Sequence, residues 1–140
     1  VSLRTALKRS MNVATIALAR EVGVYKIIQN AERMGISTLV DSGKYSDINL
    51  AMAIGGLTNG VVPLEMASAY GVFATGGNYA HPFAIKKIED RSGNIIYEYK
   101  PTVRRVLDEK SVYLTVDMLR DVLISGSAGG MGMAMLVKKC

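Results

Sequence analysis

The sequence predicts an α+β chain that is predominantly helical, and three observations support this. Apolar residues recur at intervals of three and four over most of the chain, which is typical of helices that bury one face. Between residues 83 and 100 the period changes to two, as in β-strands. A chain of 140 residues with 49% hydrophobic and 21% charged residues suits one packed domain rather than a disordered segment.

The helices are predicted from apolar stripes that begin and end at recognisable residues. Pro63 suits the first position of a helix, where a backbone N–H would have no intrahelical partner, and Asp108 is a good N-cap. Glycines mark the predicted ends. The predicted helical segments are, in order, Leu3 up to Gly23, Val24 up to Gly35, Ile48–Ile54, Pro63–Thr75, and the residues between Asp108 and Gly126.

The strands and loops are predicted from alternation and from turn residues. Phe83–Glu89 and Ile95–Lys100 are expected to form a β-hairpin around the glycine-containing loop Asp90–Asn94. Val103–Leu107 is expected to be one more short strand, and Ser37–Asp47 a surface loop. Residues 1–126 therefore form the predicted domain, and residues 127–140 are expected to be a flexible tail rich in Gly and Met.

Charge and composition argue against several functional classes. The net charge is +5, but the basic residues are scattered and do not interleave with aromatic residues, so no nucleic-acid partner is expected. The sequence has no apolar run near the roughly 20 residues that a membrane span requires. The single Cys140 lies at the end of the sequence, and the methionines are typical of core packing, so neither a disulfide nor a metal or cofactor site is expected.

The triplet Ser10-Met11-Asn12 is the main candidate for chemistry. On one continuous helix, residues two apart point about 200° apart and could not serve one site. If the helix instead breaks at Ser10, the Ser10 hydroxyl and the Asn12 carboxamide can face one cleft, where the first relays a proton and the second donates and accepts hydrogen bonds. The alternative is a helix-capping serine followed by a polar surface asparagine.

Several blocks of the sequence resemble the penicillin-binding transpeptidases, especially the bifunctional class A proteins. The residues around Ser10 resemble the S-x-N motif of that family, and the blocks that follow have the family's order and spacing. These blocks are Ala6–Ala14, Ala51–Gly56, Val61–Tyr70 ("T-P-L-E-x-A-x-A-Y"), Phe73–Gly77 ("F-A-N-G-G"), Asp90–Asn94 ("D-x-x-G-N") and Val112–Leu119 ("A-Y-x-x-x-D-M-L").

The resemblance implies part of the serine β-lactamase and penicillin-binding transpeptidase fold, with the principal sheet strands largely missing. The family's S-x-x-K motif, which carries the acylated serine, and its K-T-G motif do not occur in this sequence. The sequence also begins at Val1 with helical periodicity already running by Leu3. We therefore expect a piece of a longer protein that is inactive alone and that exposes apolar surface, with self-association as one result.

The resemblance also implies a function for the longer protein. It would cross-link peptidoglycan stem peptides ending in D-Ala-D-Ala through an acyl-serine, react with β-lactams, and be membrane-anchored at the extracytoplasmic face of a bacterial cell. Ser10 would relay a proton, and Asn12 would hydrogen-bond the substrate amide and the catalytic lysine. Two alternatives stay open: a noncatalytic helical interaction module on the same scaffold, and a hydrolase relative such as a D,D-carboxypeptidase or β-lactamase.

Overall fold

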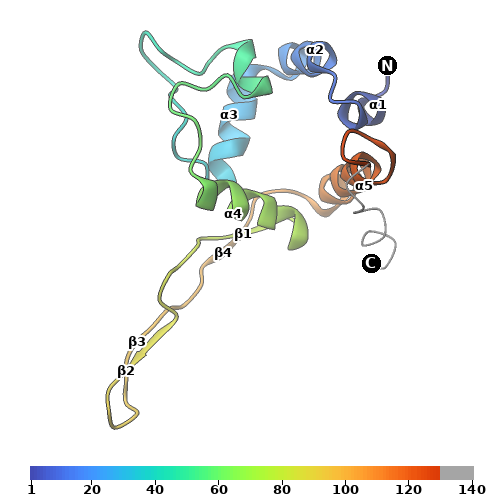
Figure 1. Ribbon diagram of the computed structural model, residues 1–140. Coiled ribbons are helices and arrows are strands. Elements are labelled where there is room, and N and C mark those ends of the chain that lie inside the picture. Colours follow the sequence, from blue (N-terminus) through green and yellow to red (C-terminus); the bar gives the residue numbers. More distant parts are fainter. Residues whose placement is uncertain (130–140) are drawn as a thin grey trace.

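The computed structural model describes residues 1–129, in which helices form a ring and a β-hairpin projects from it (Figure 1). Contacts between neighbouring helices connect α1 to α2, α2 to α3, α4 to α5, and α5 back to α1. The helical elements are α1 (Leu3–Lys8), α2 (Asn12–Val22), α3 (Val24–Arg33), the 3₁₀ helix η1 (Leu50–Ile54), α4 (Pro63–Ala74) and α5 (Glu109–Ser125).

The helix ends follow the capping residues that the sequence suggests. Pro63 is the first residue of α4, and the Asp108 carboxylate accepts a hydrogen bond from the Ser111 amide at 3.0 Å at the start of α5. Hydrogen bonding from the Ser111 side chain, and then from its amide, lowers the pKa of Asp108. The predicted helix at Ile48–Ile54 is shorter in the structure, because the Asn49 side chain caps it by accepting from the Ala51 amide at 2.9 Å.

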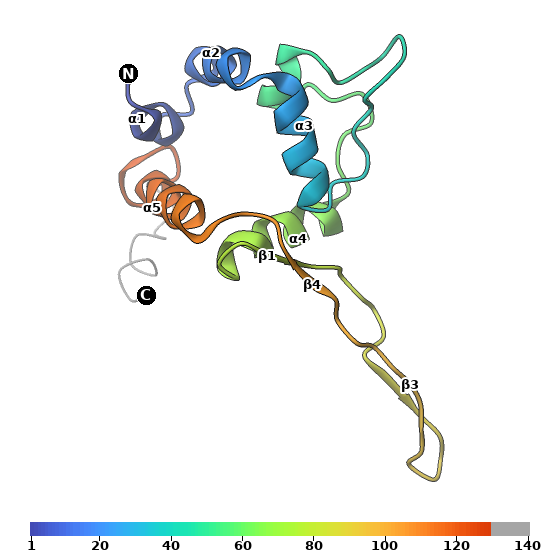
Figure 2. The same cartoon turned by 180° about the vertical axis from the view of Figure 1, so that it is seen from behind.

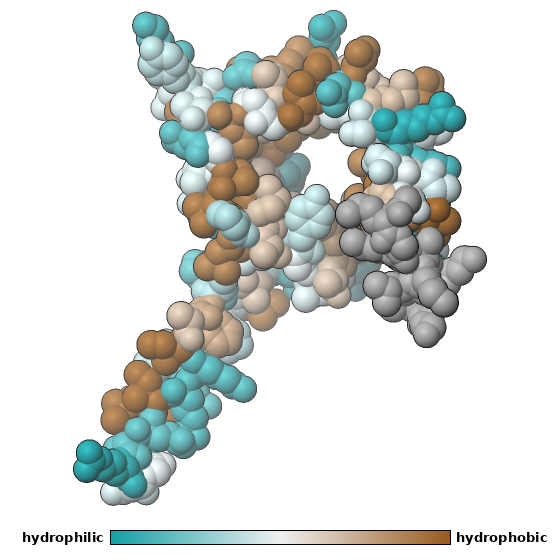
Figure 3. All heavy atoms as spheres, viewed as in Figure 1, coloured by the Kyte–Doolittle hydropathy of each residue, from teal (hydrophilic) through white to brown (hydrophobic). Residues whose placement is uncertain are grey.

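The ring has an open centre. Seen from both sides, the helices surround a gap between α3 and the α1–α5 pair (Figure 2). The space-filling view shows that side chains leave an opening there (Figure 3). Many large apolar side chains of the helices are exposed, including Leu3, Leu64 and Leu114. The described residues therefore form a shell of helices without a single central core.

The largest cluster of buried side chains lies where α4 meets a small sheet. Val72, Tyr79 and Val106 form this cluster, and Met34 and Leu107 pack against it. Tyr79 belongs to β1 (Asn78–Ala80), which pairs antiparallel with β4 (Val103–Arg105). The strand that begins at Val103 was predicted from the sequence, whereas β1 was not, because three residues are too few to show alternation.

The projecting arm is the predicted hairpin. It contains β2 (Lys87–Glu89) and β3 (Ile95–Glu98), paired antiparallel, and both are shorter than predicted. The Asp90 carboxylate organises the loop by accepting from the amides of Ser92 and Asn94, both at 2.8 Å. Phe83 and Tyr99 stack at the base of the arm with ring centroids 4.1 Å apart.

The segment between α3 and α4 is held by two carboxylates. Asp47 is 1% exposed and accepts from the amides of Val40 at 2.8 Å and Thr58 at 2.7 Å, which lower its pKa. Glu65 on α4 accepts from both the hydroxyl and the amide of Ser37. The prediction of a surface loop over Ser37–Asp47 is therefore wrong for its last residue. Asp47 is buried, and its carboxylate holds the segment through hydrogen bonds to two backbone amides.

The predicted fold class is confirmed: the described part of the chain is predominantly helical, with short antiparallel strands and a hairpin. Residues 127–129 continue from α5, and Gly129 donates to the Gly126 carbonyl at 3.0 Å. The rest of the predicted tail, residues 130–140, lies outside the described residues.

Candidate functional site

The helix breaks at Ser10, as the second interpretation of the triplet requires. Ser10 has φ +51° and is the only non-glycine residue with positive φ among residues 1–129. Its amide donates to the Leu7 carbonyl at 3.0 Å, and the Met11 amide donates to the Ala6 carbonyl at 2.9 Å. These two bonds are the Schellman pattern that ends a helix, with Ser10 in the left-handed position.

A serine in this position is unfavourable. Glycine usually occupies the left-handed residue of this turn, because a Cβ there crowds the backbone and costs about 1–2 kcal/mol. Eight glycines among residues 1–129 adopt positive φ, so glycine occupies every other left-handed position in this part of the chain. A strained residue of this kind is a recognised sign of a functional position.

Asn12 is the first residue of α2, and its side chain is exposed beside the turn. Met11 is the N-cap residue of α2 and makes no side-chain capping bond. Within residues 1–129, neither the Ser10 hydroxyl nor the Asn12 carboxamide forms a hydrogen bond. Within the described residues Ser10 makes no side-chain capping bond, and the side chains of Ser10 and Asn12 are both exposed.

Two ion pairs made by Arg4, in the first turn of α1, fix α1 against α5. Arg4 donates to the Asp121 carboxylate at 2.6 Å and to the Asp117 carboxylate at 2.5 Å. These hydrogen bonds, that from Asp121 first, raise the pKa of Arg4 above its ordinary value. Asp117 thus contributes to the packing of α5 against α1 through its ion pair with Arg4.

The end of α5 contacts the site turn directly. The Ser127 amide donates to the Lys8 carbonyl at 3.1 Å, which gives a partner to a carbonyl in the last turn of α1. A Cβ on Gly126 would lie 2.6 Å from that same Lys8 oxygen. Gly126 is therefore required for the close approach, a role that its position after a helix stripe did not reveal.

An apolar groove of about 200 Å³ lies beside the turn, between α1, α2 and α5. Ser10 and Asn12 do not line it. The two predicted residues share one turn, but the groove is formed by other, mainly apolar residues. The residues that line the groove are Leu3, Ala6, Leu7, Ala14, Thr15, Leu18 and Met118.

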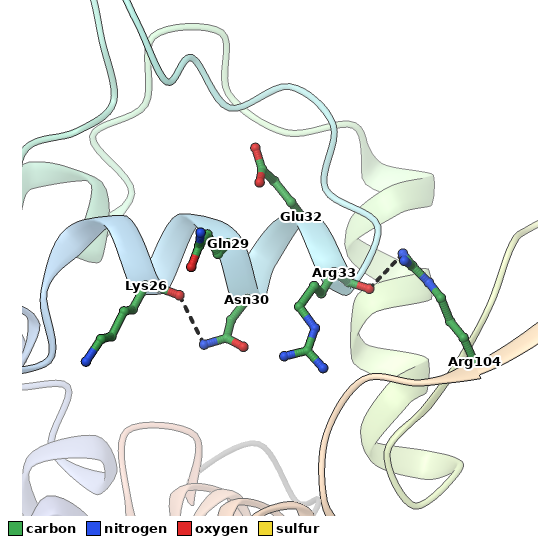
Figure 4. A pocket seen from close by; sticks show the side chains of 6 residues that line it. All are labelled: Lys26, Gln29, Asn30, Glu32, Arg33 and Arg104. Atoms are coloured by element: carbon green, nitrogen blue, oxygen red, sulfur yellow. Dashed lines mark hydrogen bonds between the residues drawn. The ribbon is translucent and has the colours of Figure 1, made fainter.

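A second, polar depression of about 580 Å³ lies along α3 (Figure 4). Two of its side chains make structural contacts: Arg104 donates to the Arg33 carbonyl at 2.9 Å and lies over the Tyr79 ring, and Asn30 donates to the Lys26 carbonyl. Neither Ser10 nor Asn12 lines this depression.

The described residues offer neither a metal-binding cluster nor a membrane-spanning helix. Residues 1–129 contain no group of three or more His, Cys, Asp or Glu side chains placed to hold a metal ion. No helix in this part of the chain has the length and apolar character to cross a membrane. The site thus consists of Ser10, Asn12 and the contacts that hold their turn.

Comparison with known families assigns the chain. The sequence model of the family described as "Penicillin binding protein transpeptidase domain" matches residues 1–138. This chain belongs to that family. The family that the sequence motifs predicted is therefore confirmed.

Related proteins carry matching names. The chain is 36% identical over 129 residues to "Penicillin-binding protein 1A" of Clostridium botulinum and 37% identical over 128 residues to "Penicillin-binding protein 1A" of Aquifex aeolicus. These matches cover 92% and 91% of this chain but 15% and 16% of the relatives. The chain thus spans about a sixth of the length of these relatives, which are named as the class A resemblance predicts.

Solved structures show the same fold. Penicillin-binding protein 1A from Haemophilus influenzae superposes with a TM-score of 0.73 at 21% identity, covering 91% of this chain and 22% of that chain. Penicillin-binding protein A from Mycobacterium tuberculosis also gives a TM-score of 0.73, at 19% identity, covering 87% of this chain and 32% of that one. The ring and its arm are therefore a portion of the penicillin-binding transpeptidase fold.

Proposed function

We propose that this chain supplies the middle motif of the active site in a longer peptidoglycan D,D-transpeptidase. In that protein a serine outside this sequence attacks the D-Ala-D-Ala peptide bond, and an amine of a neighbouring stem peptide takes the acyl group. The Ser10 hydroxyl relays a proton toward the leaving group, and Asn12 hydrogen-bonds the substrate amide and the catalytic lysine.

The strained turn at Ser10 is the observation that supports this proposal most directly. The turn holds a serine in a conformation that favours glycine, and it places an exposed asparagine two residues later. The Arg4 ion pairs and the Lys8–Ser127 hydrogen bond both hold the turn against α5 and the residues that follow it. A site that needs a fixed hydroxyl is a sufficient reason for the energetic cost of this conformation.

The proposed division of labour leaves this chain inactive by itself. The 140-residue sequence has neither S-x-x-K nor K-T-G, so the resemblance supplies no acylated serine and no strand for the substrate carboxylate. The chain alone should not be labelled by a fluorescent penicillin. Clear covalent labelling of the purified chain would contradict the assignment of the nucleophile to a segment outside it.

The decisive experiment is Ser10→Ala in the longer transpeptidase. Loss of a proton relay should slow acylation by a fluorescent penicillin by about 10²-fold or more. Alanine has nearly the same backbone strain as serine at positive φ, so the free energy of unfolding should change little. Ser125→Ala, which alters an exposed serine outside the turn, is the matched control and should acylate at the unaltered rate.

The outcomes separate the competing functions. Equal acylation rates for Ser10→Ala and the unaltered protein would reduce Ser10 to a structural residue. A longer protein that no penicillin labels, even with Ser10 intact, would favour a noncatalytic interaction module. Water rather than an amine as the acyl acceptor would indicate a carboxypeptidase or β-lactamase.

The proposed substrate sets the location of the protein. Stem peptides that end in D-Ala-D-Ala lie outside the bacterial cytoplasm, so we place the longer protein at the extracytoplasmic face of the cell membrane, held by an anchor. Its ligands there are the stem peptides and β-lactams. The division of this chain into a transpeptidase portion at residues 1–126 and a tail at residues 127–140 belongs to the same proposal.

A further inference from the structure

The β2–β3 arm lacks a partner among the described residues. Every residue of β2 and β3 is exposed. The arm projects from the ring in both ribbon views (Figures 1 and 2). A two-stranded hairpin is marginally stable in water without another strand or a covering element. The two edges of this hairpin are therefore open to a further strand.

The two edges are not equivalent. Residues pair as Lys87 with Glu98, Ile88 with Tyr97 and Glu89 with Ile95, so β3 contains one extra residue, Ile96. A bulge of this kind twists a strand and disrupts its pairing groups. The register shift falls opposite Ile88 and Glu89, but the extra residue belongs to β3, so β2 is the edge better suited to strand addition.

The free backbone groups of β2 belong to alternate residues. The Tyr99 amide donates to the Lys86 carbonyl at 2.9 Å, and the Asp90 amide donates to the Asn94 carbonyl at 2.9 Å. Because antiparallel pairing alternates, Lys86, Ile88 and Asp90 direct their backbone groups toward β3. The amides and carbonyls of Lys87 and Glu89 therefore face outward.

The sequence of β2 is complementary to itself. It contains two basic residues, one apolar residue and two acidic residues in order, Lys86-Lys87-Ile88-Glu89-Asp90. An antiparallel copy centred on Ile88 places Lys87 opposite Glu89 and Lys86 opposite Asp90. Opposite charges stabilise such cross-strand pairs, whereas edge lysines disfavour pairing with unmatched strands. In the same register, the outward amide and carbonyl of Lys87 in one copy lie opposite those of Glu89 in the other and can form hydrogen bonds with them.

The apolar face of the arm is consistent with this arrangement. Ile88 lies opposite Tyr97, and both line an apolar groove of about 400 Å³ together with Phe83, Ile85 and Tyr99. The space-filling view shows hydrophobic residues along the arm (Figure 3). If a two-fold axis perpendicular to the sheet relates two copies of the chain, their Ile88 side chains come together, and the apolar faces of the two arms form one continuous surface.

We propose that this chain associates with a second copy of itself through the edges of β2, which form a four-stranded antiparallel sheet with its two-fold axis at Ile88. The interface combines backbone bonds between Lys87 and Glu89 of the two copies with two sets of oppositely charged pairs. It does not involve the Ser10 turn.

Charge reversal on the full 140-residue chain tests the register. Sedimentation equilibrium should show a dimer, and Lys87→Glu or Glu89→Lys alone should raise its dissociation constant at least about tenfold, because like charges then face each other. The double variant K87E/E89K restores the opposite charges and should restore the dimer. A monomer at all concentrations, or a dimer unaffected by the single changes or not restored by the double change, would overturn the proposal.

A crosslink tests the same axis by an independent measurement. In a Cys140→Ser background, Ile88→Cys should form a disulfide dimer under mild oxidation, because the two residues 88 form a close pair across the axis. Ile96→Cys is the control: it is more exposed, 67% against 41%, but lies on the other strand. Crosslinking of Ile96→Cys at an equal or greater rate would contradict the β2 interface.

Discussion

The Ser10 turn and the β2–β3 arm differ in the contacts that stabilise their conformations. The Ser10 turn is strained, yet it is fixed by contacts with α5, which lies more than one hundred residues further along the chain. The β2–β3 arm is instead held by local contacts within residues 83–99, namely the pairing of its two strands and the stacking of Phe83 on Tyr99. The comparison teaches that precise geometry at the site depends on long-range contacts, whereas the arm is a local structure with free edges.

Gly126→Ala should have the largest effect on stability. The new Cβ would lie 2.6 Å from the Lys8 carbonyl oxygen and 2.7 Å from Val122 Cα, so backbone must move. Overpacking of this kind costs about 1–3 kcal/mol, which urea denaturation measures. Gly71→Ala is the matched control within α4: a Cβ there meets nothing within 4 Å, and the better helix former should stabilise by about 0.5–1 kcal/mol.

Ser10→Gly should have the next largest effect, in the opposite direction. Glycine adopts φ +51° without crowding, so the free energy of unfolding should rise by about 1 kcal/mol. The same change removes the hydroxyl, so the longer protein should lose acylation as it gains stability. A loss of stability in Ser10→Gly would contradict the strain that distinguishes the site turn from the arm.

Acidification should affect the ring more than the arm. Hydrogen bonds lower the pKa of Asp47 in the ring and of Asp90 in the arm, so both contribute stability above their unfolded pKa of about 4. That contribution is lost as the pH falls through the lowered folded pKa. Below about pH 4, the decline in unfolding free energy should be shallower in Asp47→Asn, and Asp90→Asn should change it less because its loop is exposed.

Ile88→Thr should have the smallest effect on the monomer. Ile88 is exposed on the arm, and substitutions at such positions usually change stability by less than about 0.5 kcal/mol. Thermal unfolding at dilute concentration, where the chain is monomeric, provides the measurement. A change comparable to that of Gly126→Ala would mean that the arm is coupled to the ring, and the contrast between the two regions would fail.

Much of the fold was predictable because local signals carry it. The apolar stripes, the proline at the start of α4 and the Asp108 cap gave helices within a few residues of their observed bounds. The hairpin was predicted by alternation, but its strands are shorter than expected. The bulge at Ile96 is one reason, since no alternation rule reveals which residue of a strand is left unpaired.

The candidate site was predictable in part. The S-x-N spacing and the neighbouring family blocks identified Ser10 and Asn12, and the spacing also predicted that a single helix could not serve both. The supporting residues were not predictable. Arg4 and Gly126 look like an ordinary surface residue and an ordinary helix stop, because their partners lie far away in the sequence.

The sequence alone determined the periodic elements, the helix ends and the Ser10-Met11-Asn12 triplet, since each depends on residues within a few positions of one another. The tertiary structure alone decided the pairing of β1 with β4, the burial of Asp47 and the contact of α5 with the Ser10 turn. These features join segments distant in the chain, and their energy comes from packing and hydrogen bonds that exist only once the ring has closed.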